Sequence, residues 1–239
     1  MTVHVGTSGY DYPEWKGTFY PPDLPATRML AYYAERFDVV EINATFYRMP
    51  TPATLAGWAG RTPEGFRFAL KAPQRITHFA RLRDVDEPVR FFCDAARTLG
   101  ARLGPLLFQL PPSFRKDLGR LADALALLPR DLRVAFEFRH ASWLDDEVYE
   151  RLRASNAALC IADSGDRSTP LVATADFGYL RLRDEGYGDE DLARWAATLR
   201  RLGAGWSEAF VFFKHEASGT GPAFAGRLIA LLGEPGAAS

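Results

Sequence analysis

The chain has 239 residues, 47% of them hydrophobic and 25% charged, which is typical of a globular domain about the size of an α/β barrel. The formal net charge is -1, so affinity for nucleic acid or an anionic membrane would require a local basic patch. No apolar run approaches the roughly 20 residues that span a bilayer, and the N-terminus lacks a signal-peptide pattern. We therefore expect a cytoplasmic protein without a membrane partner. Its two cysteines, Cys93 and Cys160, fall in apolar runs and are expected to be buried and reduced.

Eight short runs have the alternation or the apolar character of β-strands. In chain order, the predicted strands are Val3–Gly6, Val39–Phe46, Phe66–Lys71, Pro105–Leu110, Val134–Arg139, Ala158–Asp163, Phe177–Arg183 and Ala209–His215. The segments with helical spacing are Thr27–Phe37, Ala53–Gly60, Pro88–Leu99, Leu118–Leu128, Asp145–Ser155, Asp189–Leu202 and Pro222–Leu232. We expect a packed loop over Tyr10–Pro25, no helix in Ser164–Ala175 and a frayed tail over Glu234–Ser239.

This alternation of strands and helices predicts the fold class. Strands that alternate with helices form parallel sheets through right-handed crossovers. Eight such units in this length favour a closed (β/α)₈ TIM-type barrel over an open, doubly wound sheet. We expect residues 1–239 to form a single α/β domain.

The fifth predicted strand shows where polar groups gather. Its first half is apolar, and Glu137, Arg139 and His140 follow at its carboxyl end. Ser142 is the predicted N-cap of the next helix, with Asp145 as its capping-box partner. Polar groups at the end of a buried strand are costly unless paired, and in α/β folds they often mark a site.

Each of the other predicted strands also ends in a polar side chain, where a barrel carries its active face. The predicted catalytic residues are Glu41, Lys71, Glu137, His140, Asp163 and Lys214. The predicted substrate-binding residues are Ser8, Asn43, Tyr47, His78, Gln109, Arg139, Trp143, Arg181 and His215. The alternative interpretation is a network of paired charges that only holds the barrel mouth together.

The mixture of side chains indicates the chemistry of the ligand. Four of the side chains at the predicted strand ends are cations, namely Lys71, Arg139, Arg181 and Lys214. They repel one another where they converge, unless acids or an anionic ligand lie among them. We therefore expect a phosphate or carboxylate group held by arginine forks. Carboxylates near a lysine or a histidine could supply general acid/base catalysis, and Lys71 or Lys214 could form a Schiff base.

Other partners are less clearly indicated by the sequence. It contains no HxH, HExxH or paired-cysteine spacing, so we predict no metal ligands, and no cofactor is identified. The aromatic side chains of Tyr10–Tyr20, with Tyr47 and Trp143, could form a stacking surface for single-stranded nucleic acid. Alternatively, they pack the loop against the barrel.

Several motifs spread over nearly the whole chain resemble the YecE-like family of bacteria and archaea. They are Gly6–Tyr10, Trp15, Phe19–Pro21, Val40–Asn43, Thr45–Tyr47, Phe66–Phe68, Lys71–Pro73, Thr77–His78, Phe108–Ser113, Glu137–His140 and Ser142–Trp143. The resemblance implies a TIM-type barrel without an established activity. Similarity of that fold to barrel endonucleases and sugar isomerases points to nucleic-acid or phosphosugar chemistry by analogy.

The chain departs from the family pattern at two places. Arg183 and Asp184 stand where the family usually has His-Gly, and the last strand continues into Lys214-His215-Glu216. A repair endonuclease with several zinc ions needs more histidine ligands than these strand ends offer, which counts against that specific analogy.

Two hypotheses follow. The first is an enzyme acting on a small anionic or phosphorylated substrate, in which Glu137→Gln abolishes turnover and leaves the fold intact. The second is a nucleic-acid-binding module without its own catalysis, whose affinity falls steeply with salt.

Overall fold

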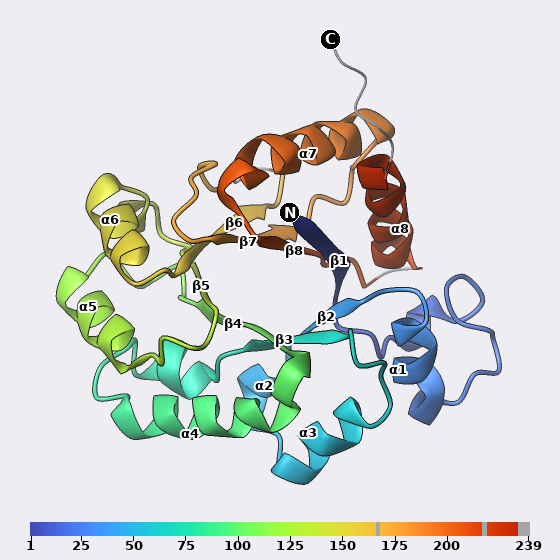
Figure 1. Cartoon of the computed structure of the whole chain (residues 1–239), viewed down its shortest axis with the longest axis horizontal. Coiled ribbons are helices and arrows are strands. Elements are labelled where there is room, and N and C mark those ends of the chain that lie inside the picture. Colours follow the sequence, from blue (N-terminus) through green and yellow to red (C-terminus); the bar gives the residue numbers. More distant parts are fainter. Residues whose placement is uncertain (166–167, 217–218, 234–239) are drawn as a thin grey trace.

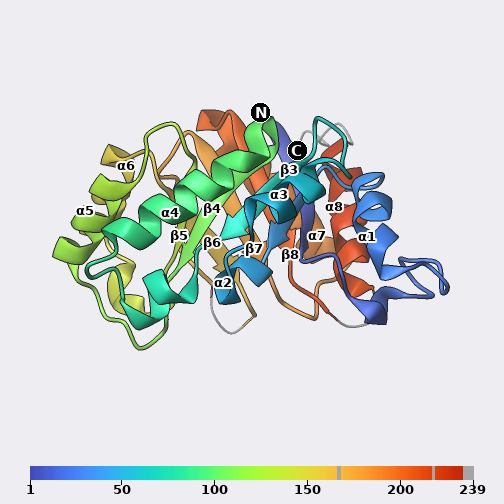
Figure 2. The same cartoon turned by 90° about the horizontal axis from the view of Figure 1, so that it is seen from below.

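The computed structural model describes residues 1–165, 168–216 and 219–233. The strands in these residues form a closed parallel barrel in chain order, in which β8 pairs with β1 (Figure 1). The helices surround the barrel, as the view turned by 90° also shows (Figure 2). The predicted (β/α)₈ barrel is confirmed.

The predicted strands and helices occur in the predicted order, and their bounds lie close to the predicted ones. The strands are β1 (Thr2–Ser8), β2 (Val39–Ile42), β3 (Arg67–Lys71), β4 (Leu103–Gln109), β5 (Val134–Glu137), β6 (Ala158–Asp163), β7 (Phe177–Leu182) and β8 (Glu208–Phe213). The helices are α1 (Ala26–Ala34), α2 (Ala44–Tyr47), α3 (Pro52–Ala59), α4 (Asp86–Ala96), α5 (Leu118–Leu127), α6 (Asp146–Ala154), α7 (Asp189–Leu202) and α8 (Thr220–Gly233). A π-helical turn covers Arg75–Phe79, and 3₁₀ turns cover Pro13–Trp15, Arg97–Arg102, Ala141–Trp143 and Gly203–Gly205.

Two layers of apolar side chains hold the barrel together. The larger cluster packs the outer faces of the strands against the helices. The smaller cluster fills the barrel interior with Val39, Ala69, Leu107, Ala135, Ala158, Cys160, Phe177, Tyr179, Phe210 and Phe212. Because side chains alternate along a strand, the residues two positions beyond these point into the barrel one layer higher.

The second strand is shorter than predicted. It ends at Ile42, and residues 44–47 form the short helix α2 instead of continuing the strand. The Thr45 hydroxyl donates to the Lys71 carbonyl at 2.6 Å and approaches the Ile42 carbonyl at 3.1 Å. These bonds turn the chain over the end of β3, so the aromatic residues after Thr45 lie beside the carboxyl ends of β2 and β3.

The predicted helix cap at Ser142 is wrong. Helix α6 begins at Asp146, and the Asp145 carboxylate caps it by accepting the Val148 N–H at 3.1 Å. Ser142 instead lies in a separate 3₁₀ turn, where its N–H donates to His140 Nδ1 at 3.1 Å. That turn is fixed because Trp143 is buried and its indole N–H donates to the Phe114 carbonyl at 2.7 Å.

The remaining expectations concern the loops and the cysteines. Trp15 and Tyr20 are buried, so the loop after β1 is packed against the barrel. No helix occurs in residues 164–165 and 168–175 of the segment predicted to lack one, and residues 166–167 lie outside the described residues. Cys93 and Cys160 are buried free thiols. The predicted frayed tail, residues 234–239, lies outside the described residues. Within those that are described, no helix is both long and apolar enough to cross a membrane.

Candidate functional site

Strand alternation places the polar ends of five strands inside the barrel. Glu41 follows Val39, Lys71 follows Ala69, Gln109 follows Leu107, Glu137 follows Ala135 and Arg181 follows Tyr179, each two residues beyond an interior apolar side chain. These side chains form a polar layer directly above the apolar interior. The end of the barrel that contains this layer is called the barrel mouth below.

Arg181 is the centre of this layer. Its Nη2 lies 2.8 Å from Glu41 Oε1, and its Nη1 lies 2.6 Å from Glu137 Oε2. All three residues are at most 1% exposed. Removing such charges from water costs on the order of several kcal/mol per ion, so further hydrogen bonds to the two carboxylates are needed to offset this cost.

Glu41 has two further donors. The Ser8 hydroxyl donates to Oε1, and the Tyr179 hydroxyl donates to Oε2 at 2.6 Å. Burial alone would raise the pKa of the Glu41 carboxyl, but the Arg181 charge and these hydrogen bonds lower it below its ordinary value. Glu41 is therefore held as a carboxylate.

Glu137 is held by still more donors. Gln109 Nε2 donates to Oε2 at 2.8 Å, Arg139 Nε donates to Oε1 at 3.0 Å, and Arg183 Nη2 lies 3.2 Å from Oε1. Although burial raises the pKa of the Glu137 carboxyl, the charges of Arg181, Arg183 and Arg139 lower it far below its ordinary value. Glu137 thus stays ionised over the whole physiological pH range.

Lys71 differs from the other cations of the mouth. It is 9% exposed, and its Nζ lies 4.0 Å from the centroid of the Phe46 ring. Among the described residues, no carboxylate forms an ion pair with this amine. Burial, followed by the charge of Arg181, lowers the pKa of Lys71 from 10.5 to about 7, although Glu41 and Glu137 act in the opposite direction.

His78 lies beside Lys71, in the turn after β3. Its ring packs edge-on against Phe46, with 4.8 Å between the centroids, and its Nδ1 lies 3.0 Å from the Thr77 hydroxyl. Burial and the charge of Lys71 lower the pKa of His78 below 6.5. The imidazole is therefore mostly neutral at pH 7.

The mouth carries more positive than negative charge. Among the described residues, the basic side chains here are Lys71, Arg139, Arg181, Arg183 and Lys214, and the buried carboxylates are Glu41 and Glu137. Lys214 also faces the exposed Glu216, with 3.8 Å between Nζ and Oε1. Burial and the charges of Arg183 and Arg181 lower the pKa of Lys214.

Three buried donors of this region have no partner among the described residues. They are Asn43 Nδ2, Arg181 Nε and Arg183 Nε. A buried donor without an acceptor costs about 1–3 kcal/mol, and such a cost is often met by a ligand. The mouth therefore has both the charge and the donors for an anion.

The predicted site residues Asp163 and His215 lie outside this cluster. The Asp163 carboxylate accepts the Tyr187 hydroxyl at 2.7 Å, and His215 Nε2 donates to the Asp184 carbonyl at 2.7 Å. His215 also packs edge-on against Phe224 of α8, with 5.1 Å between the centroids. Both side chains thus contact elements outside the barrel.

Of three other predicted site residues, His140 and Trp143 also lie outside the cluster, whereas Tyr47 lies beside it. His140 caps the 3₁₀ turn before α6, and Trp143 is fully buried with its ring stacked on Phe138 at 4.9 Å. Trp143 therefore offers no stacking surface to a ligand. Tyr47 is 73% exposed and packs edge-on against Phe46 at 5.0 Å, beside the barrel mouth.

Arg183, Tyr179 and Phe46 contribute to the mouth but were not among the predicted site residues. Strand alternation was a sufficient signal for Arg183, because it stands two residues beyond Arg181. Tyr179 could be found in the same way. Phe46 could not, because it was assigned to a strand that ends before it. As for metals, no group of three or more His, Cys, Asp or Glu side chains suited to an ion occurs in the part of the chain that the structure describes.

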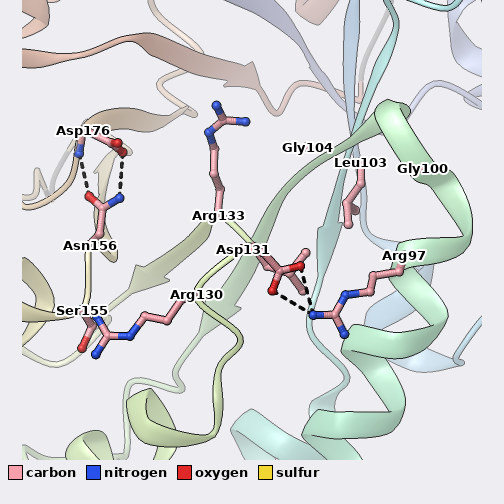
Figure 3. Close-up of a pocket in the computed structure, with 11 residues that line it drawn as sticks. Arg97, Gly100, Leu103, Gly104, Arg130, Asp131, Arg133, Ser155, Asn156 and Asp176 are labelled. Carbon is pink, nitrogen blue, oxygen red and sulfur yellow. Dashed lines mark hydrogen bonds and ion pairs between the residues drawn. The ribbon is translucent and has the colours of Figure 1, made fainter.

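A cavity of about 630 Å³ lies at the opposite end of the barrel, beside the amino ends of β4 and β5 (Figure 3). Two of its carboxylates are paired there: Asp131 accepts Arg97 Nη2 at 2.9 Å, and Asp176 accepts Asn156 Nδ2 at 2.9 Å. Since the chemistry of TIM barrels takes place at the carboxyl ends of the strands, we place the candidate site at the mouth instead.

The comparisons with known proteins agree on one family. A family model described as a protein of unknown function, DUF72, matches residues 4–239. The chain is 32% identical to the UPF0759 protein YecE of Escherichia coli over 139 residues, 58% of this chain and 48% of YecE, so the match spans about half the length of that relative. It is 24% identical to the UPF0759 protein YunF of Bacillus subtilis, over 91% of this chain and 90% of YunF. The expected resemblance to the YecE-like family is confirmed.

Solved structures agree with the barrel. A DUF72 family protein from Thermotoga maritima superposes with a TM-score of 0.86 at 28% identity, covering 98% of this chain and 100% of that one. A D-psicose 3-epimerase from Clostridium cellulolyticum covers 97% of this chain and 96% of its own, with a TM-score of 0.53 and 12% identity. An L-ribulose 3-epimerase covers 98% and 94%, with a TM-score of 0.55 and 14% identity. The two epimerases share the fold alone.

Proposed function

The chain belongs to the DUF72 family, and we propose that it is an enzyme that binds a phosphate-bearing or other anionic substrate in the barrel mouth and acts on it by acid/base chemistry. The observation that carries this proposal is the surplus of basic groups over carboxylates, together with buried donors that lack an acceptor. Arginine forks bind phosphate and carboxylate oxygens with two parallel hydrogen bonds.

The residues of the mouth divide into two roles under this proposal. Glu41 and Glu137 remain ionised because arginine, serine, tyrosine and glutamine donors surround them. They position Arg139 and Arg183 for the anion, while Arg181, whose Nη atoms pair with both carboxylates, adds its charge beneath them. Lys71 and His78 carry the proton transfers, because their pKa values lie near or below neutrality and both contact Phe46.

A specific observation favours a nucleic-acid partner as the second candidate. A groove of about 630 Å³ begins at His78 and is lined by the exposed Phe79 and by Arg81, Arg83 and Arg120. An exposed aromatic ring among arginines is a combination that binds single-stranded nucleic acid. The buried Trp15, Tyr20 and Trp143 do not add to this surface.

The proposal is tested by turnover of a panel of phosphorylated sugars and phosphorylated small acids, followed by ³¹P and ¹H NMR. We expect the wild type to convert at least one compound, and Lys71→Met to lower kcat by about 10²–10⁴-fold. Lys71→Arg is the matched control: it keeps the charge but cannot lose its proton, so it should be as inactive as Lys71→Met. Glu137→Gln should also abolish turnover with the fold intact.

Two outcomes contradict the proposal. The first is a wild type that neither binds nor converts any member of the panel, while single-stranded oligonucleotides bind with steep salt dependence. The second is unfolding of Glu137→Gln in circular dichroism, which would identify the mouth as a structural network.

A further inference from the structure

We propose that Lys71 is a nucleophile that forms an imine with a ketone or aldehyde carrying an anionic group. This inference rests on the proposed function, since the arginines that bind the anion would hold the carbonyl compound in place. It goes further by making the Lys71 nitrogen the attacking atom, so that His78 moves the protons once the imine forms, and by naming the functional group of the substrate.

The surroundings of Lys71 suit a neutral amine. It ends β3 with 9% of its surface exposed, and its Nζ faces the Phe46 ring rather than a carboxylate. The backbone at this position is fixed, because the Thr45 hydroxyl donates to the Lys71 carbonyl at 2.6 Å. The amine is thus held in place, partly desolvated and free of an ion pair, as a nucleophilic lysine requires.

The other lysines of the chain show the contrast. Lys116 forms ion pairs with Asp145 and with Glu147, the latter at 2.9 Å. Lys214 faces Glu216 at 3.8 Å and its side chain is 40% exposed. Lys16 is exposed at the protein surface. Of the lysines in the described residues, Lys71 alone combines burial with the lack of a carboxylate partner.

The lowering of the Lys71 pKa decides how much of the amine is unprotonated and able to attack a carbonyl at pH 7. Burial and Arg181 lower the pKa of Lys71 from 10.5 to about 7, which raises the fraction of free amine at pH 7 by about 10³-fold over an ordinary lysine. The attraction of the Phe46 ring for an ammonium opposes this by about two- to thirtyfold. The free amine therefore remains far more abundant than in an exposed lysine.

Neighbouring donors suit a carbonyl substrate. The register Ile42↔Leu70 places Asn43 beside Lys71 at the ends of β2 and β3, and Asn43 Nδ2 is buried without a partner. An amide N–H at this position can donate a hydrogen bond to the carbonyl or carbinol oxygen. His78 contacts the same Phe46 ring as Lys71 and is mostly neutral, so it can move the protons.

The reaction balances without an oxidant or a reductant. The Lys71 nitrogen attacks the carbonyl carbon, and the C–O π bond breaks to give a carbinolamine. A C=N bond then forms as the oxygen leaves with two protons as water. One molecule of water is released for each imine, and no residue changes its oxidation state.

The experiment is reductive trapping of the full-length protein. Dihydroxyacetone phosphate and pyruvate are each incubated with the wild type, sodium borohydride is added, and intact mass and peptide mapping follow. Hydride reduction of the imine gives a secondary amine, so the protein should gain the mass of the carbonyl compound minus one oxygen atom. Glycerol 3-phosphate, which lacks the carbonyl group, is the matched ligand control.

Matched variants locate the adduct. For at least one of the two carbonyl compounds, we expect the adduct to map to Lys71 and its yield to fall by at least about tenfold in Lys71→Arg. The yield should persist in Lys116→Arg, which changes a lysine that is paired with Asp145 and Glu147 and is not part of the mouth. Dihydroxyacetone without phosphate should label more weakly, because it lacks the anion.

Two results overturn the inference and are distinguishable by calorimetry on the same samples. If a carbonyl compound binds but gives no adduct, or labels all lysines equally, the imine is wrong and the anion-binding mouth stands. If neither compound nor glycerol 3-phosphate binds, both the imine and the proposed function fail.

Discussion

Replacing Arg181 by methionine tests whether the mouth is organised around one buried guanidinium. Arg181→Met keeps an unbranched apolar stem but removes the cation that lies 2.8 Å from Glu41 and 2.6 Å from Glu137. Among the described residues, Glu41 then keeps only the hydroxyl donors of Ser8 and Tyr179, whereas Glu137 still contacts Arg139 and Arg183. The loss should therefore be concentrated at Glu41.

The expected cost follows from the burial of these groups. Removing one partner of a buried ion pair costs about 3–5 kcal/mol, because a charge is left uncompensated. For a chain of this length, each kcal/mol lowers Tm by about 2–4 °C, so Tm should fall by about 6–20 °C. Arg183→Met is the matched control: Glu137 retains two arginine partners there, and the loss should stay below about 2 kcal/mol.

The pH dependence gives the prediction a sign. In the wild type the folded-state pKa of Glu41 is lowered, so its stabilising contribution is present above pH 4.5 and is lost as the pH falls through the folded-state value. In Arg181→Met, burial without a cation should raise the pKa of Glu41 above its unfolded value. The free-energy deficit relative to wild type should then shrink as the pH falls from about 8 to 5.

Urea unfolding followed by circular dichroism at several pH values measures both effects. The reasoning is refuted if Arg181→Met lies within about 1 kcal/mol of the wild type at pH 8, or if its deficit grows on acidification.

Two further predictions concern packing and the opposite end of the barrel. Gly178→Ala should lower the free energy of unfolding by about 1–3 kcal/mol, because the added methyl would overlap the Trp206 ring. Gly57 lies on α3 with open space around it, so Gly57→Ala should be neutral or stabilising by up to about 1 kcal/mol. Urea titrations of both variants check this, and equal effects would contradict it. Burial lowers the pKa of His4, but Asp38 and Glu208 together raise it above 6.5. The contribution of protonated His4 to the free energy of unfolding is therefore present below pH 6.5 and is lost as the pH rises through the folded-state pKa. The stability advantage over His4→Gln should therefore narrow between about pH 6 and 9, and an advantage that widens would contradict the assignment.

The order of strands and helices was predictable because each unit carries its own local pattern. Alternating Phe66, Phe68 and Leu70 indicate a strand that ends at Lys71, and β3 ends there. The same rule identified Glu41, Glu137 and Arg181 at strand ends. The alternation rule does not reveal that one arginine pairs with two glutamates from strands β2 and β5, because that contact exists only after the barrel closes.

Asp163 and His215 show why some predicted site residues lie elsewhere. In β6 both faces are apolar, with Ala158 and Cys160 inside the barrel and Leu159 and Ile161 outside, so the sequence does not reveal which face Asp163 continues. Counting from the interior residues places Asp163 on the outer face.

The same ambiguity applies to β8. Phe210 and Phe212 lie inside, and Val211 and Phe213 lie outside. Lys214 therefore follows the inner set and His215 the outer one. Side-chain direction becomes predictable only where one face of a strand is polar, as in β5.

The most direct test of the anion-binding mouth is isothermal titration calorimetry of ribose 5-phosphate into the wild type at neutral pH, with ribose as the uncharged control. We predict saturable binding of the phosphate ester, no binding of ribose, and an affinity that falls by about tenfold or more in Arg183→Met, which loses one charge-assisted fork. Equal heats for ribose and its phosphate, or an affinity unchanged in Arg183→Met, would contradict the central claim that the mouth of this barrel recognises an anion.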